Sequence, residues 1–412
     1  MEPGRNKLFN SVESPVPPIR ADLQLFPVQH NGDNVLYFHD SLGYTPPNFA
    51  LHHEAETLLS LINGSTSITD ICQAVDGTIS KNQLLEFIQL LDRNCILASP
   101  NYKITAENKE AAFEASAVRK PSLAGESYPE DSEELKRHLS GLFSNNDIKH
   151  VLSKPKKGLY APHIDPRVNQ QIYADAFSTL RNLKPKRVVV LATAHYTGYY
   201  PNVYNNTPFI GSAKNFELPI GRLSSDEKWL KYLSDQGDKI GFTTKDRAHR
   251  IEHSIEIHLL FARHIWNHDF SIVPILVNSF DELLYLPDGH LQKQIHSFIS
   301  TLRKLDDDDT FYLVSGDLAH VGRKFGDQNP AEKLRSKVET FDEQFLNAAI
   351  RNQPKKLFEQ VRKDYDPFRI CGFPPLYTFL QLFPELSGDL IGYHWWDEKE
   401  RESAVSFGAI RY

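Results

Sequence analysis

Imidazole and carboxylate side chains directly follow three short apolar segments of this chain. Two imidazoles with one anionic group can hold a transition metal, and the same groups can transfer protons without one. A single histidine behind a strand is more often a hydrogen-bonded loop residue, so the repetition over three segments is what points to function. The groups are His163 after residues 158–161, His195 after residues 188–192, and Asp317 and His320 after residues 311–315.

Further polar side chains open a predicted helix in the middle of the chain. Glu252 and Glu256 are four residues apart and share one helical face, while His253 and Glu256 are three apart. A helix that starts at the same sheet edge would direct Glu252 and His253 into the crevice. His258 is expected to point outward or to lie at the edge of the core, and the residues expected on the surface are His249, His264 and His268.

Cys371 differs from the other cysteines because Gly372 and two prolines follow it closely. This sequence predicts a tight turn that opens a helix, where the helix N-terminus would favour a thiolate. A structural thiol and a functional thiol are equally compatible with the pattern. Cys72 and Cys95 fit small core residues. Three scattered cysteines are too few for a disulfide framework, which favours a reducing, cytoplasmic setting.

The elements that must position these groups alternate between strand and helix from Pro121 to Tyr412. Short apolar runs without alternation are typical of strands covered on both faces, so we predict an α/β domain with a mainly parallel sheet. Ligands of such sheets bind beyond the carboxyl ends of the strands. The predicted strands are 158–161, 188–192, 272–277 and 311–315, and the predicted helices are 169–183, 254–264, 291–305, 331–352 and 375–383.

The first 105 residues form a different pattern, which predicts a small, mainly helical, winged-helix-like domain. Residues 106–118 lack a sustained core-facing pattern and are expected to be a linker to the α/β domain at 119–412. The predicted elements are helices at 54–62, 68–75 and 80–92, a final strand at 95–97, and an apolar run at 35–38 whose edge could accept an extended peptide.

Charge and composition exclude several classes of protein. With 40% hydrophobic residues the chain is globular. The net charge of −7 argues against nucleic-acid binding, and the first 105 residues, with 6 basic and 11 acidic side chains, have a net charge of −5. No run of 18 apolar residues predicts a membrane span, and the N-terminal sequence is not that of a signal peptide.

Residues 119–412 resemble the Memo family, the Memo-like component of the "AmmeMemoRadiSam" protein set. The likeness rests on the order and spacing of short sequence blocks. These blocks are residues 119–129 (RKPSLAGESYP), 159–163 (LYAPH), 190–195 (VLATAH), 252–258 (EHSIEIH), 272–277 (IVPILV), 315–320 (SGDLAH), 370–372 (ICG) and 403–409 (SAVSFGA).

The resemblance implies a fold similar to class III extradiol dioxygenases, with a non-haem metal site. Its metal ligands would be His163, His195 and Cys371, and the metal would be iron or copper. His253, Asp317 and His320 would surround the same pocket in catalytic, acid–base or supporting roles. Among the nearby carboxylates, we expect Asp317, and next Asp165, to accept the second N–H of a ligating imidazole.

Two departures from the family pattern alter the charge around this pocket. Ile164 and Asp165 replace the Ala-Gly that follows the family's Pro-His, and His249-Arg250-Ile251 precedes Glu252 where the family often has an acidic residue. The N-terminal pattern resembles PqqD domains, which hold peptides for modifying enzymes.

Three functions remain compatible with the sequence: a metal-dependent oxidoreductase of dioxygenase type, a non-catalytic metal-binding protein beside a radical-SAM partner, and a metal-free peptide-binding adaptor. A thiolate ligand favours the non-catalytic metal-binding protein over the oxidoreductase, because a thiolate also binds Cu(I) and Zn.

Overall fold

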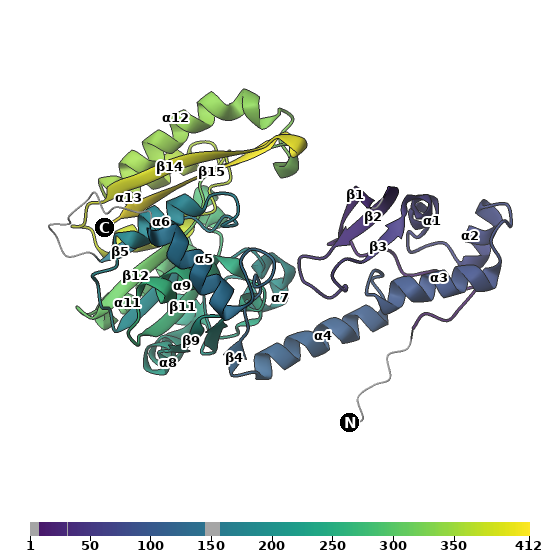
Figure 1. Ribbon diagram of the computed structural model, residues 1–412, viewed down its shortest axis with the longest axis horizontal. Helices are drawn as coiled ribbons and strands as arrows, with labels where there is room; N and C mark the ends of the chain where they lie inside the picture. Colours follow the sequence, from purple (N-terminus) through teal and green to yellow (C-terminus); the bar gives the residue numbers. More distant parts are fainter. Residues whose placement is uncertain (1–7, 31, 145–156) are drawn as a thin grey trace. The chain divides into compact units, whose positions relative to one another are not determined.

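The computed structural model describes residues 8–30, 32–144 and 157–412. The chain divides into two compact units, Met1–Ala115 and Ser116–Tyr412, each of which is described by itself (Figure 1). Among the helices of the described residues, none is both long enough and apolar enough to cross a membrane.

A twelve-stranded sheet forms the centre of the second unit, and its main path runs β13-β15-β5-β12-β6-β11-β9-β8-β4. The neighbours β5, β12, β6 and β11 are all parallel. The α/β fold with a mainly parallel sheet is therefore confirmed. All four predicted strands are present, as β5 (Gly158–Ala161), β6 (Arg187–Thr193), β11 (Ser271–Val277) and β12 (Thr310–Ser315).

Register brings the ends of these strands to one edge of the sheet. Ser315 at the end of β12 lies opposite Ala161 at the end of β5 and opposite Ala192 in β6. Thr193 at the end of β6 lies opposite Val277 at the end of β11. The segments that follow these strands, with their histidines and Asp317, therefore begin at a common edge.

Helices cover both faces of this sheet, which explains the uninterrupted apolar runs. In β6, Val189 and Leu191 pack into one hydrophobic cluster, and Val188 and Val190 pack into another on the opposite face. The five predicted helices are present, although α6 ends at Ser178 rather than at residue 183. They are α6 (Gln170–Ser178), α9 (His253–Ile265), α11 (His290–Leu305), α12 (Ala331–Ile350) and α14 (Phe373–Leu382).

A long antiparallel hairpin lies at one side of the sheet, and α12 lies along it (Figure 1). The hairpin is β14 (Asp389–Glu398) and β15 (Ser403–Arg411). The other strands are β4 (Val118–Arg119), β7 (Phe209–Gly211), β8 (Asn215–Leu218), β9 (Gly221–Ser225), β10 (Phe242–Thr243) and β13 (His320–Gly322). The other helices are α5 (Ser132–Ser144), α7 (Pro201–Tyr204), α8 (Glu227–Gln236), α10 (Asp281–Tyr285) and α13 (Pro354–Arg362).

The first unit begins with an antiparallel sheet that precedes its helices, whereas the sequence predicted helices followed by a strand. Residues 95–97 make only an isolated bridge, between Leu97 and Ile19. Residues 106–115, assigned to the linker, belong to a helix. The elements are β1 (Gln24–His30), β2 (Asp33–His39), β3 (Ala50–His52), α1 (Glu56–Leu61), α2 (Ile68–Ala74), α3 (Lys81–Arg93) and α4 (Pro100–Ala115).

The apolar run at 35–38 is not a sheet edge, so its prediction as a peptide-accepting edge is wrong. This run lies in β2, which pairs with β1 on one side and with β3 on the other, so its backbone groups already have strand partners. Its alternate side chains Leu36 and Phe38 are buried in the core. The long edge is β1, in which Pro27 lacks an N–H to offer a further strand. Cys72 and Cys95 are buried, as predicted.

Candidate metal centre

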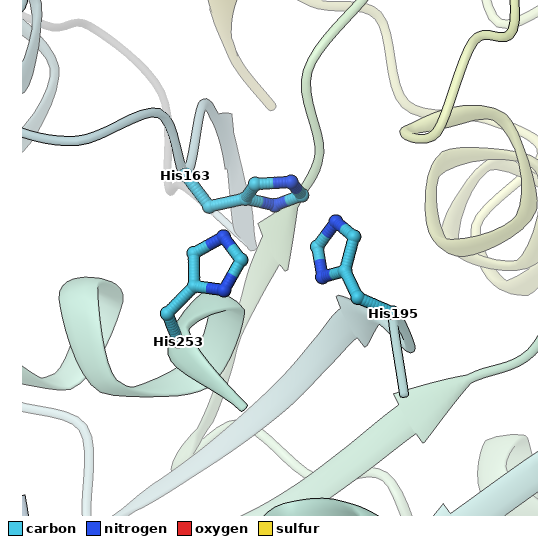
Figure 2. Close-up of side chains that lie close together, drawn as sticks. All are labelled: His163, His195 and His253. Carbon is cyan, nitrogen blue, oxygen red and sulfur yellow. The ribbon is translucent and has the colours of Figure 1, made fainter. Parts of the chain in front are cut away.

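Three histidines from three elements meet at the predicted edge of the sheet (Figure 2). His163 follows β5, His195 follows β6, and His253 is the first residue of α9. The ring centroids are 4.8 Å apart for His163 and His195, 5.3 Å for His163 and His253, and 4.7 Å for His195 and His253. One ring nitrogen of each lies within 4.8 Å of the others, which makes the trio a candidate metal-binding group.

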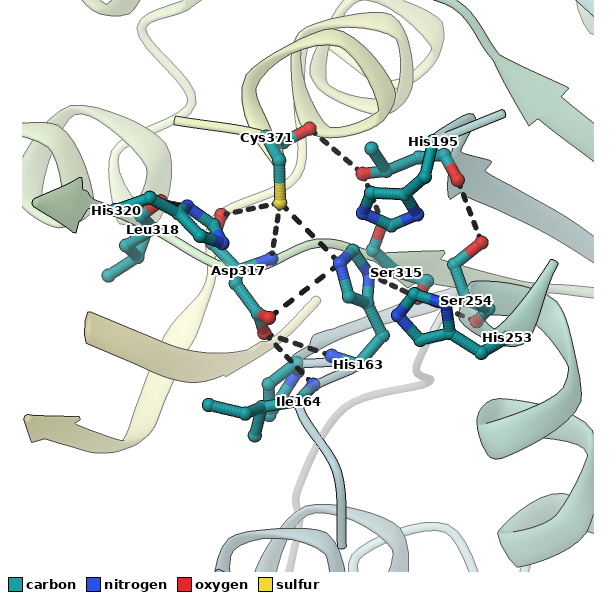
Figure 3. A network of polar contacts seen from close by, with 12 residues as sticks. His163, Ile164, His195, His253, Ser254, Ser315, Asp317, Leu318, His320 and Cys371 are labelled. Atoms are coloured by element: carbon teal, nitrogen blue, oxygen red, sulfur yellow. Dashed lines mark hydrogen bonds and ion pairs between the residues drawn. The ribbon is translucent and has the colours of Figure 1, made fainter. Parts of the chain in front are cut away.

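A second candidate group shares His163 with the first (Figure 3). The Nε2 of His163 lies 3.5 Å from the Sγ of Cys371 and 3.6 Å from the Oδ2 of Asp317. Within the described part of the chain, the predicted trio of His163, His195 and Cys371 is not found as one group by the same 4.8 Å limit. His163 thus joins a nitrogen-rich group to a group with a thiol and a carboxylate.

Hydrogen bonds fix the orientation of the His163 ring. The Ser315 hydroxyl donates to the carbonyl oxygen of Ser254 at 2.8 Å, so it is free to accept from the Nδ1–H of His163 at 3.2 Å. This tautomer leaves the lone pair of Nε2 facing Cys371 and Asp317. Burial and the neighbouring histidines hold the pKa of His163 well below its usual value, so the ring is neutral, as a metal ligand must be.

Glu252 orients His195 in the same way. Its carboxylate accepts the backbone N–H of His195 at 2.8 Å and lies 2.9 Å from Nδ1, which leaves Nε2 of His195 open to a ligand. Burial opposes ionisation of Glu252, but His195 outweighs it and lowers the pKa of Glu252 to about 2. Burial also opposes the charge on His195, yet Glu252 raises the His195 pKa. Glu252 caps α9 as well, by accepting from the N–H of Ser254.

His253 stacks on His195 with an interplanar angle of 20° and lies 3.4 Å from Glu252 through its Nδ1. Burial and the nearby His195 lower its pKa to about 4. A neutral imidazole at this position can either coordinate a cation or accept a proton.

Asp317 supports the backbone around His163 rather than its second ring nitrogen. Its Oδ1 accepts the backbone N–H of His163 at 3.0 Å and that of Ile164 at 3.3 Å. Glu252 therefore makes, for His195, the contact that we expected of Asp317. Burial raises the pKa of Asp317 to about 7, so this carboxyl group can hold or release a proton near neutral pH.

Cys371 is fixed by the close packing of two backbones. The N–H of Gly372 donates to the carbonyl of Asp317 at 2.9 Å, and a Cβ on Gly316 would collide with the Cα of Gly372. Burial and the neighbouring Asp317 raise the pKa of the Cys371 thiol, so the expected thiolate is disfavoured unless a cation replaces the proton.

The other predicted polar residues lie outside both groups. The Nδ1 of His320 faces the carbonyl oxygens of Leu318 and Arg369, at 3.1 and 3.0 Å. The Asp165 carboxylate binds Arg167 and accepts from Ser127 at 2.8 Å, and therefore does not support His163.

Two histidines that were expected near the surface are buried. His258 supports the turn before His163, because its Nε2 lies 3.0 Å from the carbonyl of Pro162. His249 was expected on the surface but is 1% exposed, because its Nε2 binds the carbonyl oxygen of Ile210 at 2.9 Å.

Sequence reasoning placed Glu252 in the crevice but did not predict its contact with His195, and it missed the orienting residue Ser315. Glu252 carried a signal, because it stands at the N-cap position immediately before a histidine. Ser315 carried none, since its role depends on its register opposite β5 and β6.

The donor set fits a transition metal. Ser315 and Glu252 hold the Nδ1 atoms of His163 and His195, so that the Nε2 atom of each imidazole can face a metal, an arrangement typical of metal-binding histidines. The nearby Cys371 and Asp317 supply softer and harder anionic ligands, and iron and copper accept such mixed sets.

Comparison with known proteins extends this description. The sequence profile of the Memo-like protein family matches residues 119–411. A MEMO1 family protein of Aquifex aeolicus (strain VF5) is 25% identical over 399 residues, which cover 95% of this chain and 99% of the relative. One from Saccharolobus solfataricus is 26% identical over 318 residues, covering 71% of this chain and 99% of that relative. The chain belongs to the Memo-like protein family.

Proposed function

We propose that this protein holds a redox-active transition metal, iron or copper, at the junction of the two groups that share His163. The ligands would be His163 and His195, with Cys371 as the anionic third ligand. The observation that carries the proposal is the locked orientation of both imidazoles, each with its other nitrogen bonded to Ser315 or Glu252. A side chain that served only packing would not need this arrangement.

The surrounding residues would position the site and manage protons. A bound iron or copper ion would supply one-electron chemistry and Lewis acidity there. Glu252 balances positive charge that develops at His195, which is 2.9 Å away. Asp317, with a pKa of about 7, can hold a proton next to His163, and the neutral His253 can accept one. These properties favour a dioxygenase-like or other redox role.

The identity of the third ligand separates two versions of this site. His253 lies in one group with His163 and His195, whereas Cys371 lies in the other group. X-ray absorption of the iron-loaded or copper-loaded protein distinguishes them, because a metal–sulfur distance near 2.3 Å requires Cys371. We expect sulfur scattering in the wild type and in His253→Gln, and its loss in Cys371→Ser. Wild-type spectra without sulfur scattering would assign the third metal ligand to His253 instead of Cys371.

Oxygen uptake tests whether the site turns over or only binds metal. Iron-loaded protein is mixed with a catechol, and oxygen consumption is recorded for the wild type, for His253→Gln and for the exposed control His296→Gln. Uptake that falls at least about tenfold in His253→Gln alone supports catalysis with His253 as a proton acceptor. Metal binding without uptake would instead support the non-catalytic alternative, a metal-binding adaptor that works with a radical-SAM partner.

A further inference from the structure

A pocket of about 600 Å³ opens beside the candidate metal centre. Two of the proposed ligands, His195 and Cys371, lie in its wall, whereas His163 and His253 do not. Its volume falls in the range of small-molecule sites. The buried part of the wall is mostly apolar and partly aromatic, and it includes Val277, Phe280, Leu284, Val361, Phe373 and Pro374.

The basic side chains in this wall are already neutralised. His195 is paired with Glu252, and Arg369 forms an ion pair with Asp327 and donates from its Nε to the carbonyl of His320 at 2.9 Å. Neither Glu252 nor Asp327 lines the pocket.

Two carboxylates of the wall have no such partner. Among the described residues, no lysine, arginine or histidine lies within ion-pair distance of Asp281 or Asp366. Both oxygens of Asp366 accept the backbone N–H of Ile370, at 3.1 and 2.9 Å. Burial and the neighbouring Asp281 raise the pKa of Asp366 to about 6, while the N–H of Ile370 and the charge of Arg369 oppose this rise. Since Arg369 forms its ion pair with Asp327, the two carboxylates leave an excess of negative charge in the pocket wall.

Two exposed tyrosines in the same wall also favour a cation. Tyr285 and Tyr365 are 64% and 58% exposed, and their rings stack with centroids 4.7 Å apart. Aromatic faces attract ammonium groups through their quadrupole. Tyr365 and Asp366 have φ angles of 56° and 54°, a conformation that costs a non-glycine residue about 1–3 kcal/mol and is concentrated at ligand sites.

We propose that this pocket binds a small organic molecule that joins an apolar ring to a protonated amine. The ring would pack against Phe280 and Phe373, within reach of His195 and Cys371, and the ammonium group would face Asp281 and Asp366. The inference rests on the proposed function, because the metal centre would act on the molecule held here. Carboxylate-bearing analogues of the same size are disfavoured by the same two aspartates.

Two probes with the same ring and opposite charge test this preference. 2-Phenylethylamine and 3-phenylpropionate are titrated into the full-length, metal-free protein at neutral pH and about 0.15 M salt, and binding is followed by ligand-observed NMR and calorimetry. We expect the amine to bind about tenfold more tightly than the acid, the equivalent of one charge contact in a partly buried site. Equal or tighter binding of the acid, or no binding of either probe up to about 10 mM, would overturn the proposal.

Matched variants assign the effect to the pocket. Asp281→Asn and Asp366→Asn each remove one charge, and the asparagine at 366 keeps an oxygen for the N–H of Ile370. We expect each to weaken amine binding about three- to tenfold and to leave the acid unaffected or better bound. Asp288→Asn, an exposed change outside the pocket wall, should leave both probes unaffected. An amine affinity of Asp281→Asn and Asp366→Asn equal to that of Asp288→Asn and the wild type would contradict the proposal.

Metal binding is measured on the same samples, so that the two proposals can fail separately. Protein that binds metal but does not prefer the amine refutes the pocket assignment and leaves the metal site intact. Protein that prefers the amine but binds neither iron nor copper refutes the metal site alone.

Discussion

His163 is the residue on which the candidate site depends. It is 2% exposed, its backbone N–H is held by Asp317, its Nδ1 by Ser315, and its Nε2 faces both Cys371 and Asp317. These contacts come from the end of β12 and from the turn before α14, so the orientation of the ring is fixed before any ligand arrives. Such preorganisation is what a metal site requires of its ligands.

Glu252 offers the first test at this scale. Glu252→Gln keeps the size of the side chain but removes the charge that orients His195, so we expect metal affinity to fall about 10- to 100-fold. The affinity is measured by competition with a chelator of known strength. Glu217→Gln, an exposed change in β8, serves as the control and should bind metal like the wild type. An unchanged affinity in Glu252→Gln would remove Glu252 from the site.

The sequence predicted which residues gather at the site better than it predicted their partners. His163, His195, His253, Asp317 and Cys371 do converge, because the carboxyl ends of parallel strands share one edge. Which carboxylate bonds to which imidazole depends on side-chain reach across several strands, and no spacing in the sequence encodes it. Asp317 was therefore assigned the contact that Glu252 makes.

At the scale of elements, β5, β6, β11 and β12 could be predicted because both of their faces are covered and their sequences are uninterrupted apolar runs. The helix α4 could not, since its apolar residues do not gather on one face, and its buried Glu110 accepts a hydrogen bond from Tyr44. The hairpin β14–β15 was missed because β14 is half-buried in its middle, is exposed towards its ends and mixes polar with aromatic residues.

The contact between the end of β12 and the start of α14 is tested by Gly372→Ala. A methyl group at this position would collide with the hydroxyl of Tyr160 and with the carbonyl of Asp317, so Cys371 must move away from His163. We expect a loss of metal affinity of at least about tenfold with the far-UV circular dichroism unchanged. The control Gly141→Ala adds a methyl group in open space on α5. Wild-type affinity in Gly372→Ala would show that the glycine contact does not position Cys371.

The buried His249, which lies just before α9, predicts how stability depends on pH. Burial lowers its pKa from 6.5 to about 4, which corresponds to roughly 3 kcal/mol of differential stability. Because the folded-state pKa is depressed, this stability is complete above pH 6.5 and is lost as the pH falls towards 4. Between pH 6.5 and 4, the free energy of unfolding measured with urea should fall less in His249→Gln than in the wild type. An equal fall in both proteins would show that His249 does not cause this pH dependence.

At the scale of the whole molecule, the chain joins a Memo-like unit at 116–412 to a separate N-terminal unit. The first unit has a net charge of −5 up to residue 105, from 6 basic and 11 acidic residues. The alignment with the Aquifex aeolicus relative covers 95% of this chain, so it extends into this unit.

This charge predicts that the N-terminal unit does not bind nucleic acid, although its helices suggested a winged-helix domain. In a gel-shift titration of the full chain against duplex DNA at about 0.15 M salt, we expect no saturable complex, because no positive surface is available to release counterions. The single-stranded form of the same DNA serves as a second probe. A tight, salt-dependent complex with either would contradict the prediction.

The central claim is that one transition metal binds at His163, and the metal content of the protein tests it most directly. The full chain is loaded with iron or with copper under anaerobic conditions, freed of excess metal and analysed by plasma mass spectrometry beside His163→Ala and a control, His268→Ala. His268 precedes β11, contacts the carbonyl oxygen of Pro185 and belongs to neither candidate group. The account predicts one metal ion per chain in the wild type and in His268→Ala, and a near-complete loss in His163→Ala at unchanged thermal stability of the metal-free proteins. Equal metal content in His163→Ala and the wild type, or no retained metal in the wild type, would contradict it.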